Sequence, residues 1–211
     1  GLGSGTEAEN RSEAALLERL ADGAMWDETT PSLATAKTQA ARMSRSYRRH
    51  IAPFVVPILI EQRLVADVGD GWHLSGQADV LAGDPHELLR DTKSGVKRRN
   101  NSHQYGAYSI VLSAHDLAPR RIVEDYVPRV RLSLDQPPPE THEVPLAAAV
   151  AEAWDTIDGI KAAVIEFERR AADPSGREPA GAFRANPASS LCGEKWCPAH
   201  GTEFCKITRR S

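Results

Sequence analysis

The stretch of residues 74–105 constrains the fold more than any other part of this sequence. Within it, two short apolar runs end in acidic residues, Asp79 and Asp91, and a Gly-Asp-Pro segment at 83–85 separates them. Apolar runs on either side of such a segment predict two strands joined as a hairpin. A chain that folds in this way places the two carboxylates at neighbouring positions on adjacent strands.

The second of these strands ends in Asp91-Thr92-Lys93, which adds a lysine to the two acids. Side chains alternate along a strand, so Asp91 and Lys93 should point to one side and Thr92 to the other. The carboxylates of Asp79 and Asp91, with the carbonyl of Thr92, offer the oxygen ligands that Mg²⁺ and Mn²⁺ prefer. A bound metal lowers the pKa of a coordinated water, and Lys93 can orient that water or stabilise a developing oxyanion. The pattern predicts metal-assisted phosphodiester hydrolysis; turn acids and an exposed ion pair are the alternative.

A basic, glycine-containing loop and then a helix follow the lysine. The cations of the loop, Lys97, Arg98 and Arg99, lie next to the predicted metal site. We expect them to contact substrate phosphates, although solvated charge is the alternative. The helix brings Gln104 and Tyr105 to the same site from its first turn.

Three short motifs resemble, in their order and spacing, the signatures of the PD-(D/E)XK nuclease superfamily: Gly76-Gln77-Ala78-Asp79, Asp91-Thr92-Lys93 and Gln104-Tyr105. More narrowly, they resemble the RecB-type branch, over residues 5–130 and again at 192–205. The resemblance implies an α/β, restriction-endonuclease-like core, with a mixed, largely antiparallel central sheet flanked by helices. It also implies a metal-dependent nuclease in which Asp79 and Asp91 bind the metal and Lys93 is the catalytic lysine. Gln104 and Tyr105 would line the site.

The same branch carries a G-x-x-x-His or G-x-x-x-Glu element in its first helix, which adds a metal ligand. The segment Gly5-Thr6-Glu7-Ala8-Glu9 fits the second form and implies that Glu9 is this ligand. An ordinary acid in the first turn of a helix, favoured by the helix dipole, is the alternative. Glu61 occupies a position where the family often has a glutamate on its first strand, and we expect a structural role for it.

The three cysteines of the chain, Cys192, Cys197 and Cys205, cluster near its C-terminus. An odd, clustered set does not suit a disulfide framework and predicts a metal site in a reducing compartment. With His200 they could close a tetrahedral zinc site; alternatively they ligate an iron–sulfur cluster, which needs a fourth cysteine. The resemblance favours a [4Fe–4S] cluster, because CRISPR adaptation exonucleases and phage relatives complete a similar block with a cysteine near the N-terminus. That cysteine would lie upstream of Gly5, so either a segment is missing there or the fourth ligand does not exist.

The rest of the chain predicts elements that surround this centre. A helix over residues 33–50 is basic and could track a phosphate backbone, although a solvated surface is the commoner case; its cations are Lys37, Arg42, Arg45, Arg48 and Arg49. Strands are predicted over 58–66, 73–81, 87–93 and 120–127. A long amphipathic helix over 145–170 should pack on the body through an apolar face that includes Trp154. We expect a core domain over residues 1–172 and a linker with a metal-binding tail over 173–211.

Composition restricts where nucleic acid could bind. The net charge of the 211 residues is −3, so binding must come from local basic patches rather than from the whole chain. No apolar run approaches membrane-spanning length and the start does not resemble a signal peptide, which predicts a cytoplasmic protein. The resemblance implies that its setting is a bacterium or a phage-infected host.

Together these features predict a metal-dependent DNA exonuclease that acts on single-stranded or frayed ends. The resemblance places it in phage or bacterial recombination or repair, with a recombination or helicase partner. Two alternatives stay open: a non-catalytic, metal-stapled DNA-binding module of the same fold, and a structural zinc protein that mediates protein contacts.

Overall fold

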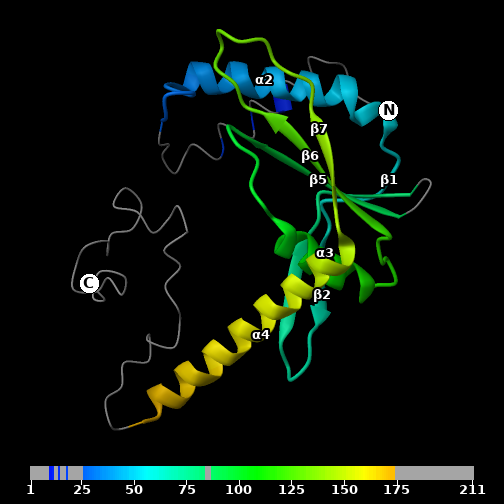
Figure 1. Cartoon of the computed structure of the whole chain (residues 1–211), viewed down its shortest axis with the longest axis vertical. Helices are drawn as coiled ribbons and strands as arrows, with labels where there is room; N and C mark the ends of the chain where they lie inside the picture. Colours follow the sequence, from blue (N-terminus) through cyan, green and yellow to red (C-terminus); the bar gives the residue numbers. More distant parts are fainter. Residues whose placement is uncertain (1–9, 12–13, 15–17, 19–25, 84–86, 174–211) are drawn as a thin grey trace. The chain divides into compact units, whose positions relative to one another are not determined.

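The computed structural model describes residues 10, 11, 14, 18, 26–83 and 87–173 (Figure 1). The chain divides into two compact units, residues 1–154 and 155–211. The first unit contains the sheets and the predicted acidic site. Several predicted ligands lie outside the described residues, namely Glu9, Cys192, Cys197, His200 and Cys205. Among the described helices, none combines the length and the apolar character that crossing a membrane requires.

A five-stranded mixed sheet forms the centre of the first unit, with the strand order β1-β4-β5-β6-β7. Among the described strands of this sheet, only β5 and β6 pair in parallel; the other three pairings are antiparallel. The prediction of a mixed, largely antiparallel sheet flanked by helices is therefore confirmed. The strands are β1 (Pro57–Ile60), β4 (Val80–Ala82), β5 (Leu88–Gly95), β6 (Arg121–Pro128) and β7 (Glu140–Val144).

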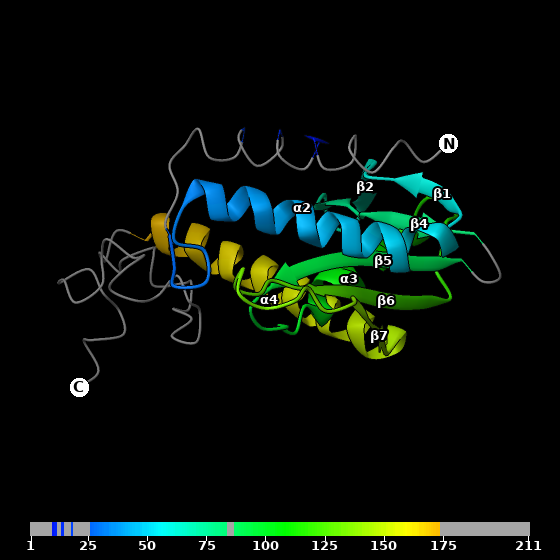
Figure 2. The same cartoon turned by 90° about the horizontal axis from the view of Figure 1, so that it is seen from above.

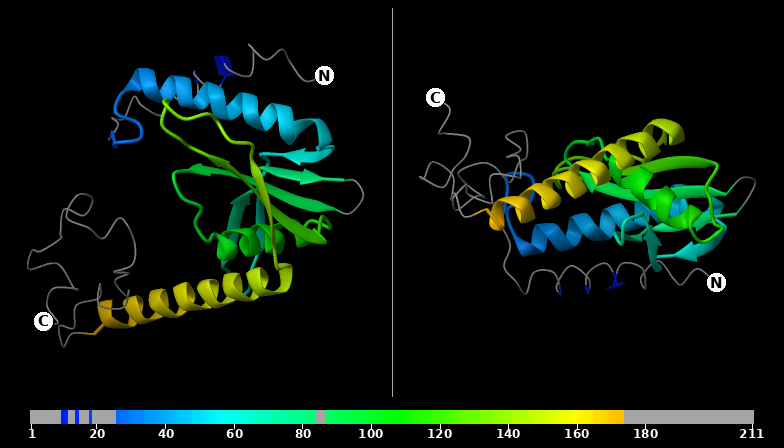
Figure 3. Two further views of the ribbon diagram at one scale, coloured as in Figure 1. Left: turned by 45° about the horizontal axis from the view of Figure 1, so that its top comes forward. Right: turned by 90° about the horizontal axis from the view of Figure 1, so that it is seen from below.

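Helices cover the two faces of this sheet, as Figures 2 and 3 show. Helix α2 (Leu33–His50) follows an N-cap at Ser32, whose hydroxyl accepts a hydrogen bond from the amide of Thr35, and a short 3₁₀ helix, η1 (Ala52–Phe54), follows it. Helix α3 (Ser102–Ser113) connects β5 to β6 on the opposite side. We call the two sides of the sheet the α2 face and the α3 face. Because side chains alternate along β5 and β6, neighbouring residues of these strands belong to different faces.

The predicted strands at 58–66 and 73–81 are each interrupted, which corrects the sequence interpretation. The chain leaves the main sheet after β1 and enters a separate hairpin of β2 (Arg63–Asp67) and β3 (His73–Gln77), which contacts α3. Glu61 adopts a left-handed conformation with φ of 47°, and its amide donates to the carbonyl of Asp79 over 3.0 Å. The chain thus bends between β1 and β2 and again between β3 and β4, and the hydrogen bond from Glu61 to Asp79 joins the two bends. Asp79 lies at the second bend, directly before β4.

The hydrophobic core of the unit lies on the α3 face, where strand residues meet α3 and the start of α4 (Leu146–Ala171). Burial of each large apolar side chain there contributes about 1.5–3 kcal/mol. The buried members are Ala78, Leu81, Leu89, Tyr105, Leu112, Ile122, Val144 and Ala149.

Helix α4 packs through small residues, which also differs from the prediction. Ala149 and Ala153 are buried, whereas Trp154, predicted to belong to the packing face, is exposed. The reason is a close approach between helices at Gly106 of α3, where a Cβ atom would lie 1.9 Å from the carbonyl oxygen of Ala149. Only a glycine at 106 allows the two backbones this separation.

Candidate active site

Asp91 is the centre of the predicted site and is fully buried in the middle of β5. The alternation of the strand brings Lys93 to the same side, as predicted, and the Lys93 ammonium lies 2.7 Å from Asp91 Oδ2. Within the described residues, neither carboxylate oxygen of Asp91 accepts a hydrogen bond of good geometry, so this ion pair is its main compensation. A buried carboxylate with so few partners is costly unless a further cation or donor joins it.

Asp79 joins the site through the backbone of β5. Its Oδ2 accepts a hydrogen bond of 2.8 Å from the amide of Thr92. The antiparallel register pairs Val80 with Arg90, which places Asp79 beside the level of Asp91. The hairpin predicted from the sequence therefore brings the two carboxylates to adjacent positions on neighbouring strands.

A third carboxylate, Glu124, lies at the same level, and the sequence did not point to it. Glu124 is the parallel-strand partner of Asp91 and is fully buried. The hydroxyl of Tyr105 donates to Glu124 Oε2, and the guanidinium of Arg98 donates to Oε1 over 2.5 Å. The side-chain amide of Asn101 donates to Oε2 over 3.3 Å. Glu124 thus connects the first turn of α3 to the basic loop that precedes it.

The electrostatics of the two buried acids differ. Burial raises the pKa of Asp91 to about 6; Lys93 counteracts this effect, while the charges of Asp79 and Glu124 add to it. Burial also acts to raise the pKa of Glu124, but the hydrogen bonds from Tyr105, Arg98 and Asn101 outweigh it and hold the pKa below its ordinary value. Glu124 therefore has several hydrogen-bond donors, whereas Asp91 has the Lys93 ammonium as its main partner and two carboxylates nearby.

This difference between the two acids bears on where a metal ion could bind. The described residues contain no group of three or more histidine, cysteine or acidic side chains arranged around one point. Mg²⁺ often takes only one or two carboxylates and completes its shell with water and substrate phosphate. Asp91, with its two poorly satisfied oxygens, and Asp79 beside it suit a divalent cation of this kind.

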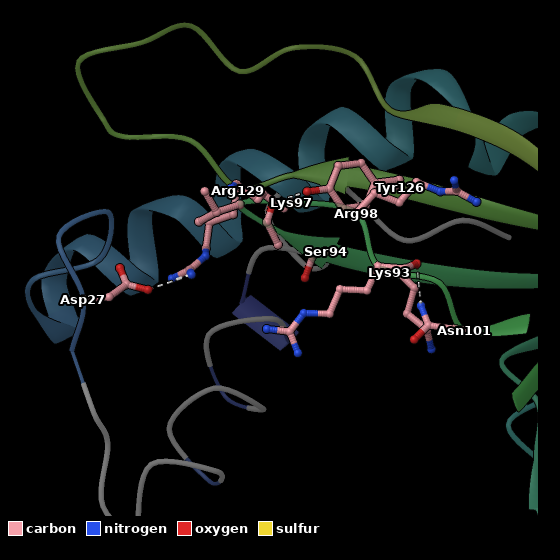
Figure 4. A pocket seen from close by; sticks show the side chains of 11 residues that line it. Asp27, Lys93, Ser94, Lys97, Arg98, Asn101, Tyr126 and Arg129 are labelled. Atoms are coloured by element: carbon pink, nitrogen blue, oxygen red, sulfur yellow. Dashed lines mark hydrogen bonds and ion pairs between the residues drawn. The ribbon is translucent and has the colours of Figure 1, made fainter. Parts of the chain in front are cut away.

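A basic pocket of about 810 Å³ opens beside Lys93 (Figure 4). Asp27 is the one acidic residue among its described lining residues, and its carboxylate is bound to Arg129 over 2.8 Å. Lys93 belongs both to the pocket and to the ion pair with Asp91, so the cationic pocket adjoins the buried acids. Its cations are Lys93, Lys97, Arg98, Arg99 and Arg129.

The remaining predicted site residues fall into two groups. Tyr105 reaches the site, since its hydroxyl meets Glu124 and its ring lies 5.7 Å from the Lys93 ammonium. Gln104 instead donates to the hydroxyl of Tyr108, one turn along α3, over 2.6 Å. Thr92 takes part through its amide, and a metal contact of its carbonyl stays a prediction.

Glu124 and Arg129 are the functional candidates that sequence reasoning missed. Glu124 stands 33 positions after Asp91 (124 − 91), within an apolar strand, and only the parallel register brings the two together. Arg129 meets Asp27, which is 102 positions away. No short-range spacing signals either contact; the acidic pair Glu124-Asp125 inside a buried strand was the one available sign.

Comparisons with known proteins concern the fold. No family model matches the sequence, and no curated protein matches it. A crystal structure from Eubacterium rectale, named "Putative exonuclease", is similar over 89% of this chain and 71% of its own, with a TM-score of 0.50 and 11% identity. The structure of the protein SSO0001 aligns over 82% of this chain and 97% of its own at 13% identity, with a TM-score of 0.32. The chain shares its α/β fold with the Eubacterium rectale protein.

Proposed function

We propose that this protein is a deoxyribonuclease that depends on Mg²⁺ or Mn²⁺ and digests DNA from its ends. The observation that carries the proposal is Asp91, a buried carboxylate whose oxygens lack hydrogen bonds within the described residues, paired with Lys93 at the edge of a basic pocket. Such an arrangement suits a cation and a phosphate at neighbouring positions. The name of the Eubacterium rectale protein and the RecB-type motifs agree with this proposal.

Asp79 and Asp91 are the residues that would hold the metal ion, with Glu9 and the Thr92 carbonyl as further predicted ligands. A bound ion supplies a water of lowered pKa and neutralises charge on the phosphate. Lys93 is placed to orient the attacking water and to stabilise the charge that develops on the phosphate oxygens. Tyr105 limits the freedom of Lys93 by its position against the lysine side chain.

The basic pocket supplies the substrate contacts of this mechanism. Phosphate contacts position a nucleic acid without reading its sequence, which suits a nuclease of low specificity. Lys97, Arg98 and Arg99 are the cations proposed to meet the strand next to the scissile phosphate, and Arg129 extends the same surface. The resemblance to RecB-type nucleases leads us to propose a role in phage or bacterial recombination or repair, with a helicase as partner.

The test compares end-labelled linear DNA with closed circular DNA, in Mn²⁺ or EDTA, for the wild type, Lys93→Ala and the control Lys161→Ala. We expect loss of the linear substrate only, in Mn²⁺ only, with the control active and Lys93→Ala at least about a hundredfold slower. Cleavage of the circle would replace the exonuclease with an endonuclease. DNA binding without cleavage of either substrate would favour the non-catalytic binding module.

The metal of the C-terminal cysteines is a separate proposal that rests on the sequence. A [4Fe–4S] cluster held by Cys192, Cys197 and Cys205 absorbs visible light, whereas zinc held by the same cysteines and His200 is colourless. The absorption spectrum and metal content of protein purified without oxygen distinguish the two.

A further inference from the structure

A second basic hollow, of about 520 Å³, lies where α2 meets the segment between β6 and β7. None of its described lining residues is acidic. We call it the arginine groove, and its charged and polar lining includes Arg42, Arg45, Arg48, Arg49, His50 and Gln136.

Helix stability explains only part of this cluster. Arg48 and Arg49 lie in the last turn of α2, where cations are favoured by the helix dipole. That effect fades within one turn, so it does not account for Arg42 and Arg45, which lie further back on the helix. Arg48 and Arg49 form no ion pair with any acid in the described part of the chain.

The two walls of the groove are fixed to each other by hydrogen bonds. The Arg42 guanidinium donates to the carbonyl of Leu132, at 3.3 Å, and to that of Leu134. The Ser46 hydroxyl donates to the carbonyl of Pro137 over 3.2 Å. These bonds use neutral carbonyls, so they hold Arg42 in place without cancelling its charge. The groove is therefore pre-organised, which lowers the entropic cost of binding a ligand.

The segment between β6 and β7 links the arginine groove to the basic pocket. Arg129 lines the pocket and Gln136 lines the groove, seven positions further on (136 − 129). Seven residues span at most about 25 Å, so the two hollows lie within that reach of each other. In one strand of duplex DNA, where successive charges lie about 3.4 Å apart, about seven nucleotides cover this maximal distance.

We propose that the arginine groove binds the phosphate backbone of the substrate strand beyond the basic pocket, which rests on the proposed function. Arginine suits this task because its planar guanidinium forms paired hydrogen bonds with phosphate oxygens. The groove extends the substrate site along one strand, so a long strand contacts both hollows.

The test uses the full chain with Arg48→Ala/Arg49→Ala, and binding of a labelled single strand of about 30 nucleotides in EDTA over a salt series. We expect at least tenfold weaker binding and a salt slope smaller by about 1.4, since each neutralised phosphate contributes about 0.7. The loss of affinity should be smaller for an oligonucleotide of about four nucleotides, which covers less of the combined surface. Arg48→Lys/Arg49→Lys should restore most of the slope but only part of the affinity.

The matched control is Arg120→Ala/Arg121→Ala, which removes the same charge from a pair of arginines at the start of β6 that face Glu87 and Glu143. If the groove variant and this control bind the long strand equally, the inference is overturned, whether or not the protein cleaves DNA. Equal losses for long and short oligonucleotides overturn it as well. Arg48→Gln/Arg49→Gln keeps part of the aliphatic chain of each arginine and replaces the alanine pair if thermal unfolding shows damage. A wild-type protein that binds DNA but never cleaves it contradicts the proposed function, whereas the comparison of binding between the variants still tests the groove.

Discussion

The two faces of the β5–β6 pair carry similar ion pairs in very different surroundings. On the α2 face, Arg90 lies 3.2 Å from Asp125 Oδ2 without a hydrogen bond of good geometry in the described residues, and the hydroxyl of Thr141 donates to Oδ1 of Asp125 over 2.7 Å. On the α3 face, Lys93 lies 2.7 Å from Asp91, and neither oxygen of Asp91 receives a hydrogen bond within the described residues. Both aspartates are fully buried. A buried ion pair by itself therefore does not identify a functional site.

Surroundings decide which pair is available for chemistry. Arg90 is largely enclosed, with 12% of its side chain exposed, whereas Lys93 is 28% exposed and lines the basic pocket. Burial raises the pKa of both aspartates. Thr141 and Arg90 partly offset this rise at Asp125, and Lys93 does so at Asp91, where the charges of Asp79 and Glu124 add to the rise. We interpret the Arg90–Asp125 pair on the α2 face as structural, and we assign the proposed cation to Asp91 of the pair on the α3 face.

The strongest test of this difference is Asp91→Asn. Loss of the proposed metal ligand should lower the rate of DNA cleavage about a thousandfold or more, which corresponds to about 4 kcal/mol of transition-state stabilisation. The folded protein should remain at least as stable at neutral pH, because the substitution removes a poorly compensated buried charge. Single-turnover cleavage in Mn²⁺ and urea denaturation measure the two effects. A variant that cleaves at the wild-type rate would show that the α3 pair is structural too.

The reverse result is expected for Asp125→Asn on the α2 face. Breaking a buried ion pair by removal of one partner costs about 3–5 kcal/mol, and Arg90 would be left enclosed without its anion. Urea denaturation should show this loss, while the protein that remains folded should cleave DNA at nearly the wild-type rate. A large loss of activity at unchanged stability contradicts the division into two faces.

Glu124 sharpens the comparison, since it is adjacent to Asp125 in sequence but lies on the other face. Glu124→Gln keeps the size of the side chain and an acceptor for Tyr105, but removes the anion that holds Arg98. We expect about a tenfold to hundredfold fall in kcat/KM, largely through KM for DNA, and a loss of stability of about 1–3 kcal/mol. Steady-state kinetics on linear DNA separates the two parameters. An effect on stability alone would make Glu124 a core residue and nothing more.

The smallest expected effect concerns pH and metal. The pKa of Asp91 is about 6 in the folded protein against an ordinary 3.8, so the folded state binds this proton more tightly than the unfolded chain does. The contribution of Asp91 to the free energy of unfolding of the metal-free protein therefore falls as pH rises from about 4 to about 6 and is constant above. Mg²⁺ competes with the proton, so it should raise Tm more at about pH 7 than at about pH 4.5.

Thermal unfolding with Mg²⁺ or EDTA at the two pH values checks this expectation. Asp91→Asn should abolish the Mg²⁺ effect at both, while Asp125→Asn should retain it. An equal rise of Tm at both pH values in the wild type would mean that the ion binds elsewhere.

Local sequence was enough to predict the acidic hairpin. Strand alternation placed Asp91 and Lys93 together, and the turn between two apolar runs placed Asp79 beside them. Glu124 and the Asp27–Arg129 pair could not be predicted in this way, because parallel pairing and loop contacts join residues far apart in the chain. The bend at Glu61 was also missed, since a left-handed glutamate contradicts its local propensity and depends on tertiary contacts.

The close contact at Gly106 limits which substitutions α3 can accept next to the proposed site. The glycine follows Tyr105 directly, so the same turn of α3 that supports Glu124 from one side rests on Ala149 from the other. Even one added methyl group at 106 would have to separate the two helices, and the displacement would carry the Tyr105 hydroxyl with it. The position of Tyr105 therefore depends on the absence of a side chain at residue 106, which lies outside the proposed site.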